Sequence, residues 1–192
     1  MVNIAVAPTS PLLRIVAFMT LASFAWAASS CGKPTPAETP TVPEFERRIG
    51  AYLELENKAI ADLPALKRTD DPMEITAREV AMGEAVRAAR ANAKQGDIIT
   101  PQIAGYFKKL IKEDLQSRSA AELKLMKDEI PPFQPTVNQT YPSDHPLATF
   151  PATLLAVMPT LPAGLEYRFL TDALIIRDIK ANLIIDYIRD VF

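Results

Sequence analysis

Three short stretches near the carboxyl-terminal end decide the fold: LEYRFL at 165–170, ALIIRD at 173–178 and LIIDYI at 183–188. Each is rich in β-branched and aromatic residues, and the first alternates between apolar and polar residues, which is typical of a strand. Only Thr171-Asp172 separates the first two stretches, so we expect a hairpin with a two-residue turn. A second turn at 179–182 leads into the third stretch. The sequence therefore predicts a three-stranded antiparallel meander.

The two-residue turn also sets the register of the predicted hairpin. The facing pairs are then Phe169 with Leu174, Tyr167 with Ile176, and Glu166 with Arg177. The last of these is a favourable cross-strand charge pair. A sheet of this size needs other elements to cover its apolar face, and only the preceding residues can do so.

Four stretches before the meander have the apolar spacing of amphipathic helices. The predicted helices span about 44–63, 72–95, 101–116 and 120–129. Asp71 and Thr100 are each followed by a proline, the pattern of a capping residue before the first helical turn. Gly96 and Pro131 are stop signals for the helices before them.

A proline-rich segment at 131–164 joins the helical half to the meander, and it contains eight prolines. Its apolar residues, among them Phe133 and Tyr141, indicate that it is draped over the helices, and residues 152–158 can form one or two helical turns. Residues 44–192 thus read as one α+β domain. Its order is a four-helix amino-terminal half, the proline-rich segment and the carboxyl-terminal meander.

Residues 1–30 have the pattern of a signal peptide. The apolar run at 15–28 has 14 residues, fewer than the roughly 20 that a membrane-spanning helix needs. Ala25-Trp26-Ala27 fits a cleavage site that would release a product beginning near Ala28. An uncleaved anchor is a further alternative. The sequence therefore predicts export to the periplasm.

Cys31 offers another outcome, because it is the only cysteine of the chain and directly follows small residues at 28–30. This arrangement resembles the signal of a lipoprotein, in which such a cysteine is lipidated and becomes the new amino terminus. The Pro/Thr-rich stretch at 31–43 is typical of an extended tether. We favour lipidation of Cys31, which would anchor the domain to a membrane, over cleavage without a lipid.

The composition excludes several classes of function. A formal net charge of −2 argues against nucleic-acid binding, which uses a basic face. The sequence contains no HExxH, CxxC or GxSxG motif, no paired histidines and no phosphate-binding glycine loop. We therefore predict no cofactor and no metal site, and we assign no catalytic residue.

An enzymatic function would have to act through His145 or through carboxylates. His145 is the only histidine and follows Asp144 in a loop, Asp97 precedes the third helix, and Asp178 ends a strand. We expect Asp97 to form a turn, and we expect Asp186 to occupy an outward position of the last strand. A pair formed by Arg168 and Arg177 on neighbouring strands is a weak candidate for an anion site.

The meander and the start of the third helix carry a resemblance to a known family. The strings LPAGLEYRFL at 161–170, LIIRD at 174–178, ANLIIDYI at 181–188 and AKQGDIITP at 93–101 are similar to those of a family of uncharacterised exported bacterial proteins. The resemblance covers roughly 44–190. Because that family has no established activity, the resemblance implies no catalytic residues.

These observations lead to three hypotheses. The first is a non-enzymatic envelope module that binds an unidentified envelope protein or helps to assemble one, through the edge of the meander or the exposed side of the first helix. The second is a small periplasmic hydrolase, which requires Asp97, Asp178 or His145 to lie together in a concave pocket. The third is a small-molecule-binding protein, which requires a sizeable apolar cavity.

Overall fold

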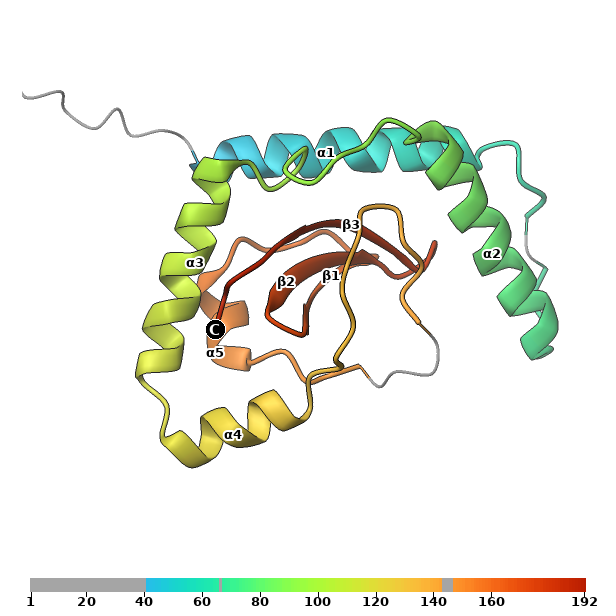
Figure 1. Ribbon diagram of the computed structural model, residues 1–192. Coiled ribbons are helices and arrows are strands. Elements are labelled where there is room, and N and C mark those ends of the chain that lie inside the picture. Colours follow the sequence, from blue (N-terminus) through green and yellow to red (C-terminus); the bar gives the residue numbers. More distant parts are fainter. Residues whose placement is uncertain (1–40, 66, 143–146) are drawn as a thin grey trace, which may run out of the picture. The chain divides into compact units, whose positions relative to one another are not determined.

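The predicted meander is present, and its strands occupy the predicted residues (Figure 1). The strands are β1 (Leu165–Leu170), β2 (Ala173–Asp178) and β3 (Leu183–Ile188), in the order β1-β2-β3 and antiparallel throughout. The predicted register of the first hairpin is confirmed, including the facing pair Glu166 and Arg177. Thr171 has a φ of 50° in the two-residue turn.

The computed structural model describes residues 41–192 apart from residues 66 and 143–146. Cys31, the signal peptide predicted at 1–30 and His145 therefore lie outside the described residues. Five helices are described: α1 (Thr41–Ile60), α2 (Pro72–Ala89), α3 (Pro101–Gln116), α4 (Ala120–Asp128) and α5 (Ala152–Val157). The α+β class is confirmed, and α5 corresponds to the helical turns expected within the proline-rich segment.

Three helix boundaries differ from the prediction, and one of them is the end of α1, at Ile60 rather than near 63. Helix α1 begins at Thr41, so the last residues of the predicted tether are helical, and Pro43 is tolerated because a first helical turn leaves its N–H groups unpaired. Helix α2 ends at Ala89 rather than near 95, where Arg90 donates its backbone N–H to the carbonyl of Val86 at 3.0 Å. The predicted stop at Gly96 does have a positive φ of 91°, but it lies in the loop after the helix.

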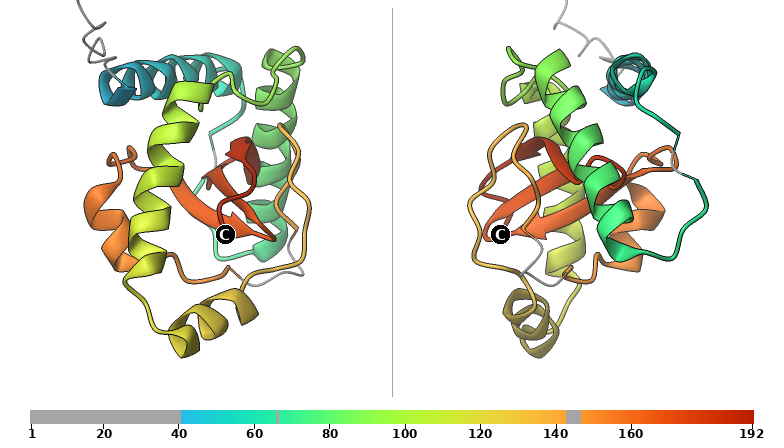
Figure 2. Two further views of the ribbon diagram at one scale, coloured as in Figure 1. Left: turned by 60° about the vertical axis from the view of Figure 1, so that its left-hand side comes forward. Right: turned by 90° about the vertical axis from the view of Figure 1, so that its right-hand side faces the viewer.

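Both faces of the sheet are covered, each by a different part of the chain. Helix α3 and the proline-rich residues 131–141 lie on opposite sides of the strands (Figure 2). The second cover brings Phe133, Val137 and Tyr141 against Ile175 and Ile184. The proline-rich segment therefore covers one face of the sheet.

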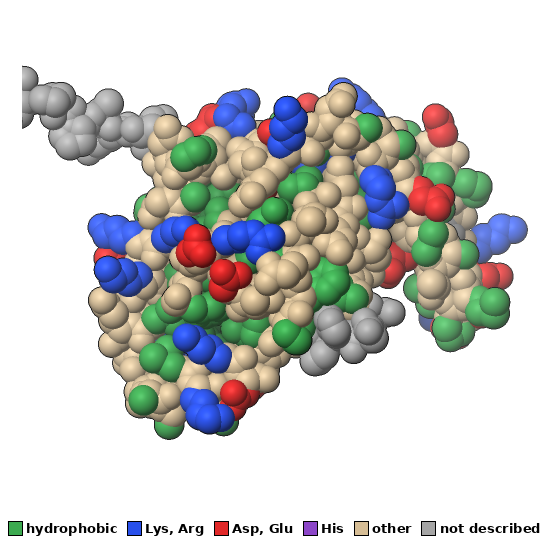
Figure 3. Space-filling model, viewed as in Figure 1, with side chains coloured by type: hydrophobic (Ala, Val, Ile, Leu, Met, Phe, Trp, Pro, Cys, Tyr) green, Lys and Arg blue, Asp and Glu red, His purple; other side chains and the backbone are tan. Residues whose placement is uncertain are grey.

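Helix α2 is buried only in its second half. Met82 and Val86 face the core, and a Cβ at Gly83 would lie 2.8 Å from the carbonyl oxygen of Ala181, so glycine allows the close approach of the β2–β3 turn. The first half exposes apolar side chains, among them Met73 and Val80 (Figure 3). Helix α2 is therefore fixed to the rest of the domain through its carboxyl-terminal half.

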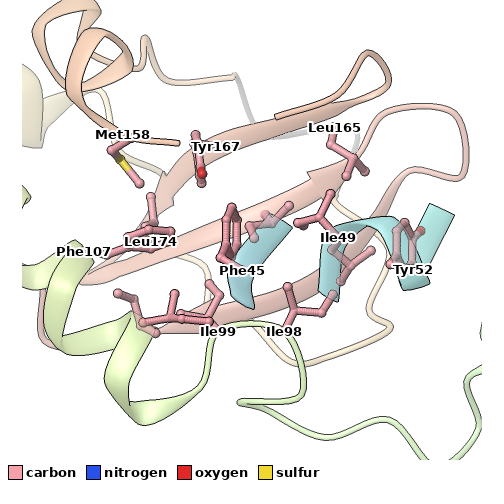
Figure 4. Close-up of a cluster of buried hydrophobic side chains, with 14 of the residues drawn as sticks. Phe45, Ile49, Tyr52, Ile98, Ile99, Phe107, Met158, Leu165, Tyr167 and Leu174 are labelled. Atoms are coloured by element: carbon pink, nitrogen blue, oxygen red, sulfur yellow. The ribbon is translucent and has the colours of Figure 1, made fainter. Parts of the chain in front are cut away.

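The main core lies between the sheet and helices α1 and α3 (Figure 4). Phe107 of α3 packs edge-on against Phe45 of α1 at 5.1 Å and against Tyr167 of β1 at 6.0 Å, measured between ring centroids. Phe150 stacks on Phe169 at 4.9 Å and on Tyr167 at 5.8 Å. The aromatic rings therefore join both helices and the proline-rich segment to β1.

Candidate functional site

A buried polar cluster lies where α1 meets the end of β2. The Tyr52 hydroxyl donates to Oδ2 of Asp178 at 2.5 Å, and the Ala181 backbone N–H donates to Oδ1 at 3.0 Å. Burial, reinforced by the charge of Asp178, raises the pKa of Tyr52 far above its ordinary value, so the hydroxyl stays a donor. Asp178 thus ends its strand as expected, but its carboxylate is buried and used to fix α1 and the β2–β3 turn.

Glu56 lies one helical turn further along α1 and is 1% exposed. Its Oε1 accepts from Nζ of Lys180 at 3.2 Å. Burial raises the pKa of Glu56, the charge of Asp178 adds to the rise, and Lys180 opposes it. Since both carboxylates of this cluster are bonded to groups of the chain itself, the cluster is a structural joint.

Asp186 is the clearest departure from the sequence-based prediction: it is 0% exposed rather than outward-facing. Its carboxylate accepts from the backbone N–H groups of Gly96 at 3.0 Å, Ile98 and Ile99 at 2.8 Å each, and Tyr187 at 2.8 Å. Burial raises the pKa of Asp186, while these four donors oppose the rise. Asp186 thereby anchors the α2–α3 loop on β3.

A bulge in β3 explains the inward position of Asp186. Asp186 pairs with Ile176 and Ile184 pairs with Arg177, so Ile185 is an extra residue that shifts the alternation of the strand. The Ile185 carbonyl accepts from Nη2 of Arg90 at 2.8 Å. A strict alternation therefore assigns the wrong face to Asp186.

Arg90 follows α2 and is 7% exposed. Besides its bond to Ile185, its guanidinium donates to Oδ1 of Asn138 at 2.8 Å and lies 5.0 Å from the centroid of the Tyr52 ring. Burial lowers the pKa of Arg90, and the charges of Asp186 and Asp178 oppose that effect. Arg90 is thus the cation of a buried network that includes both carboxylates.

The structure does not bring Asp97 and Asp178 into one pocket, as the hydrolase hypothesis requires of them. Asp97 forms a turn as expected, with its carboxylate accepting from the Lys94 backbone N–H at 2.7 Å. It borders a shallow hollow of about 380 Å³ together with Tyr52 and Arg90, but Asp178 is not among the residues that line this hollow.

The two edges of the sheet differ. The outer edge of β3 is covered by residues 138–141: the Ile184 N–H donates to Gln139 at 2.8 Å, the Asn138 N–H donates to Ile184 at 2.8 Å, and the Tyr141 N–H donates to Asn182 at 3.0 Å. Further along the same strand, Gln95 and Arg90 bond to backbone carbonyls of β3. This edge is thus occupied on both halves.

The outer edge of β1 makes fewer backbone hydrogen bonds, although Leu165 and Tyr167 are themselves buried, with 7% and 4% of their surface exposed. The register with β2 directs the backbone polar groups of Leu165, Tyr167 and Phe169 outward. The Leu165 N–H donates to Pro162 at 3.1 Å, but no residue in the described ranges hydrogen-bonds to the backbone of Tyr167 on this side. Beside it, Nη1 of Arg168 donates to the Ala148 carbonyl at 3.0 Å, and Phe150 stacks on Tyr167 and Phe169, so residues 148–150 cross the edge at this point.

A groove of about 560 Å³ lies along this edge of β1. Its apolar walls are formed by Leu147, Phe150, Leu155, Leu161 and Leu165. Two of these side chains are well exposed, Leu147 by 47% and Leu155 by 53%. The groove therefore places apolar side chains beside strand backbone that no described residue pairs with.

The charged side chains at the polar wall of the groove form ion pairs within the chain. Glu166 accepts from Arg168 at 2.6 Å and from Arg177 at 2.8 Å. Burial raises the pKa of Glu166, but the hydrogen bonds of the two arginines outweigh that effect and hold it below its ordinary value. The two arginines proposed as an anion site therefore bind a carboxylate of the chain itself.

Comparison of the chain with protein-family models, with curated proteins and with solved structures finds no match. Within the described ranges, no group of three or more metal-ligating side chains comes together. None of the helices described has the length and apolar character needed to cross a membrane. The surface of the domain itself therefore provides the observations that bear on function.

Proposed function

We propose that the chain is an exported envelope protein that acts as a binding module, and that it binds a partner protein at the β1 edge. The observation that carries this proposal is the difference between the two edges of the sheet. The β3 edge is bonded along both halves, whereas the outward backbone groups of Tyr167 in β1 have no hydrogen bond to a described residue and lie beside an apolar groove. An open strand edge is a template for pairing with another chain.

The partner segment binds in an extended conformation. Its main chain pairs with the outward N–H and carbonyl of Tyr167 and with the carbonyl of Leu165, whose N–H is bonded to Pro162. Alternate side chains of the partner enter the groove between Phe150 and Leu155. The accessible part of β1 is short because residues 148–150 cross it near Arg168. A short edge accepts a few residues of a partner and resists sheet-to-sheet aggregation.

Leu155→Glu tests this assignment. The substitution places a charge in the groove at a side chain that is already 53% exposed, so the fold is retained and partner binding weakens by about tenfold or more. The measurement is the yield of covalent adduct from a photoreactive residue at Thr160, another residue of the groove, in intact cell envelopes.

Val157→Glu is the matched control, because Val157 lies on the same helix, is 52% exposed and does not line the groove. We expect its adduct yield to equal that of the parent. Equal losses in the two variants, or no adduct at Thr160 in the parent, would contradict binding at this edge.

Cys31→Ala tests the membrane anchor that the leader pattern supports. The parent incorporates labelled palmitate and sediments with membranes, because a lipidated cysteine followed by a tether holds the domain at the bilayer. The variant loses the label and moves to the soluble fraction. If the parent carries no label and is as soluble as the variant, the proposed anchor is contradicted. That result would not affect the proposal for β1.

A further inference from the structure

An apolar hollow lies between α3, α4 and the carboxyl-terminal residues, apart from the groove at β1. Its volume is about 690 Å³, within the range of about 300–1,000 Å³ that is typical of small-molecule sites. Leu115, Leu123, Val191 and Phe192 supply its apolar lining. Figure 3 shows apolar side chains in this region with both basic and acidic side chains around them.

Helix α4 has a complete cap at its start but buries none of its residues. Ser119 and Glu122 form a reciprocal capping box, in which each side chain accepts from the other's backbone N–H, at 2.8 and 3.3 Å. No residue of α4 is fully buried, and Leu123 stays partly exposed at the wall of the hollow. An amphipathic helix with an incompletely covered apolar side can accept an apolar ligand.

The rim of the hollow is cationic. Lys112 makes no ion pair with any described residue, and Lys108 reaches only the exposed Asp190, at 4.0 Å. Nζ of Lys127 lies 5.4 Å from the centroid of the Phe192 ring. Arg118 is already paired with Asp114 at 2.7 Å. Lys108 and Lys112 of α3 therefore place two weakly paired amino groups on one side of the apolar floor, and Asp190 also lines the hollow.

We propose that this hollow binds a single-chain fatty acid. The hydrocarbon chain lies on Leu115, Leu123 and Val191, and the carboxylate binds Lys112, with Lys108 beside it. Charge complementarity selects this ligand, because an apolar floor with amino groups at its margin matches a molecule with one apolar chain and one anionic head. The site shares no residue with the β1 groove, so the two proposals can fail separately.

The test is calorimetric titration of the full chain, as the cell processes it, with dodecanoate below its micelle concentration. We expect saturable binding that Lys112→Gln weakens by about fivefold to tenfold. Lys109→Gln is the matched control, since Lys109 is on the same helix, is 73% exposed and does not line the hollow. It removes the same charge and leaves the affinity unchanged.

Two further titrations separate the head from the chain. Dodecanol, which lacks the carboxylate, binds more weakly to the parent and is insensitive to Lys112→Gln. Leu123→Asp abolishes dodecanoate binding while the circular dichroism spectrum stays that of the parent, because Leu123 is only partly buried. Absence of saturable dodecanoate binding, equal losses in the two lysine variants, or binding only to anionic phospholipid vesicles would overturn the proposal.

Discussion

Asp186→Ala is expected to lower the free energy of unfolding by about 3–5 kcal/mol. The carboxylate is fully buried and accepts four backbone N–H groups, three of them from the α2–α3 loop. Without it these donors lose their acceptor inside the protein, and each unsatisfied buried donor costs about 1–3 kcal/mol. Because water can partly replace the carboxylate, we expect the total loss of stability to be smaller than the sum of the costs of the four donors. Urea denaturation at pH 7 measures the difference.

Asp97→Ala is the appropriate comparison for this prediction. Asp97 belongs to the same loop, but it is exposed and its carboxylate accepts a single N–H, from Lys94. We expect Asp97→Ala to lower the free energy of unfolding by less than about 1 kcal/mol. If the two alanine variants lost the same stability, the loop would not depend on Asp186 as an anchor.

The strands and their register were predictable because the deciding information is local. The two-residue turn at Thr171-Asp172 sets the pairing, and Glu166 opposite Arg177 favours the same register, which the structure confirms at 2.8 Å. The starts of α2 and α3 were predictable for the same reason, since Asp71 and Thr100 cap them with their own side chains.

The position of Asp186 was not predictable from alternation. The bulge at Ile185 changes which face each later residue occupies, and what stabilises it, the bond from Arg90, comes from a residue 95 positions away. A signal was nevertheless present: an aspartate within LIIDYI needs donors, and the loop GDII at 96–99 offers consecutive N–H groups after a glycine. The sequence alone does not show that the aspartate and this loop lie next to each other.

The sequence predicted a sheet with free edges, but it did not predict which edge the rest of the chain covers. A meander has two edges, and nothing in β1 or β3 indicates which one the rest of the chain covers. Coverage of β3 comes from Asn138 to Tyr141, within the proline-rich segment, and from the loop that ends α2 early. The apolar spacing predicts a helix through residue 95, but tertiary contacts outweigh this preference. The side chains of Arg90 and Gln95 bond to β3.

Arg90→Met is expected to cost about 3–5 kcal/mol of unfolding free energy. Methionine keeps much of the apolar stem but removes the two hydrogen bonds to Ile185 and Asn138. It also removes the buried positive charge that faces Asp186 and Asp178, so two buried carboxylates lose their nearest compensation. Urea denaturation measures the loss, and amide hydrogen exchange is expected to rise first along the outer edge of β3.

Arg87→Met is its matched control, because Arg87 lies in the last turn of α2, just before Arg90, and also bonds to the proline-rich segment, at Asn138 and Thr140, but from a partly exposed position. We expect a cost of about 1 kcal/mol there. Arg90 and Asp186 hold the same loop to the same strand, so their losses should not add. The double variant should be more stable than the sum of the single losses predicts, by about 1 kcal/mol or more. Strict additivity would mean that the two residues fix β3 independently.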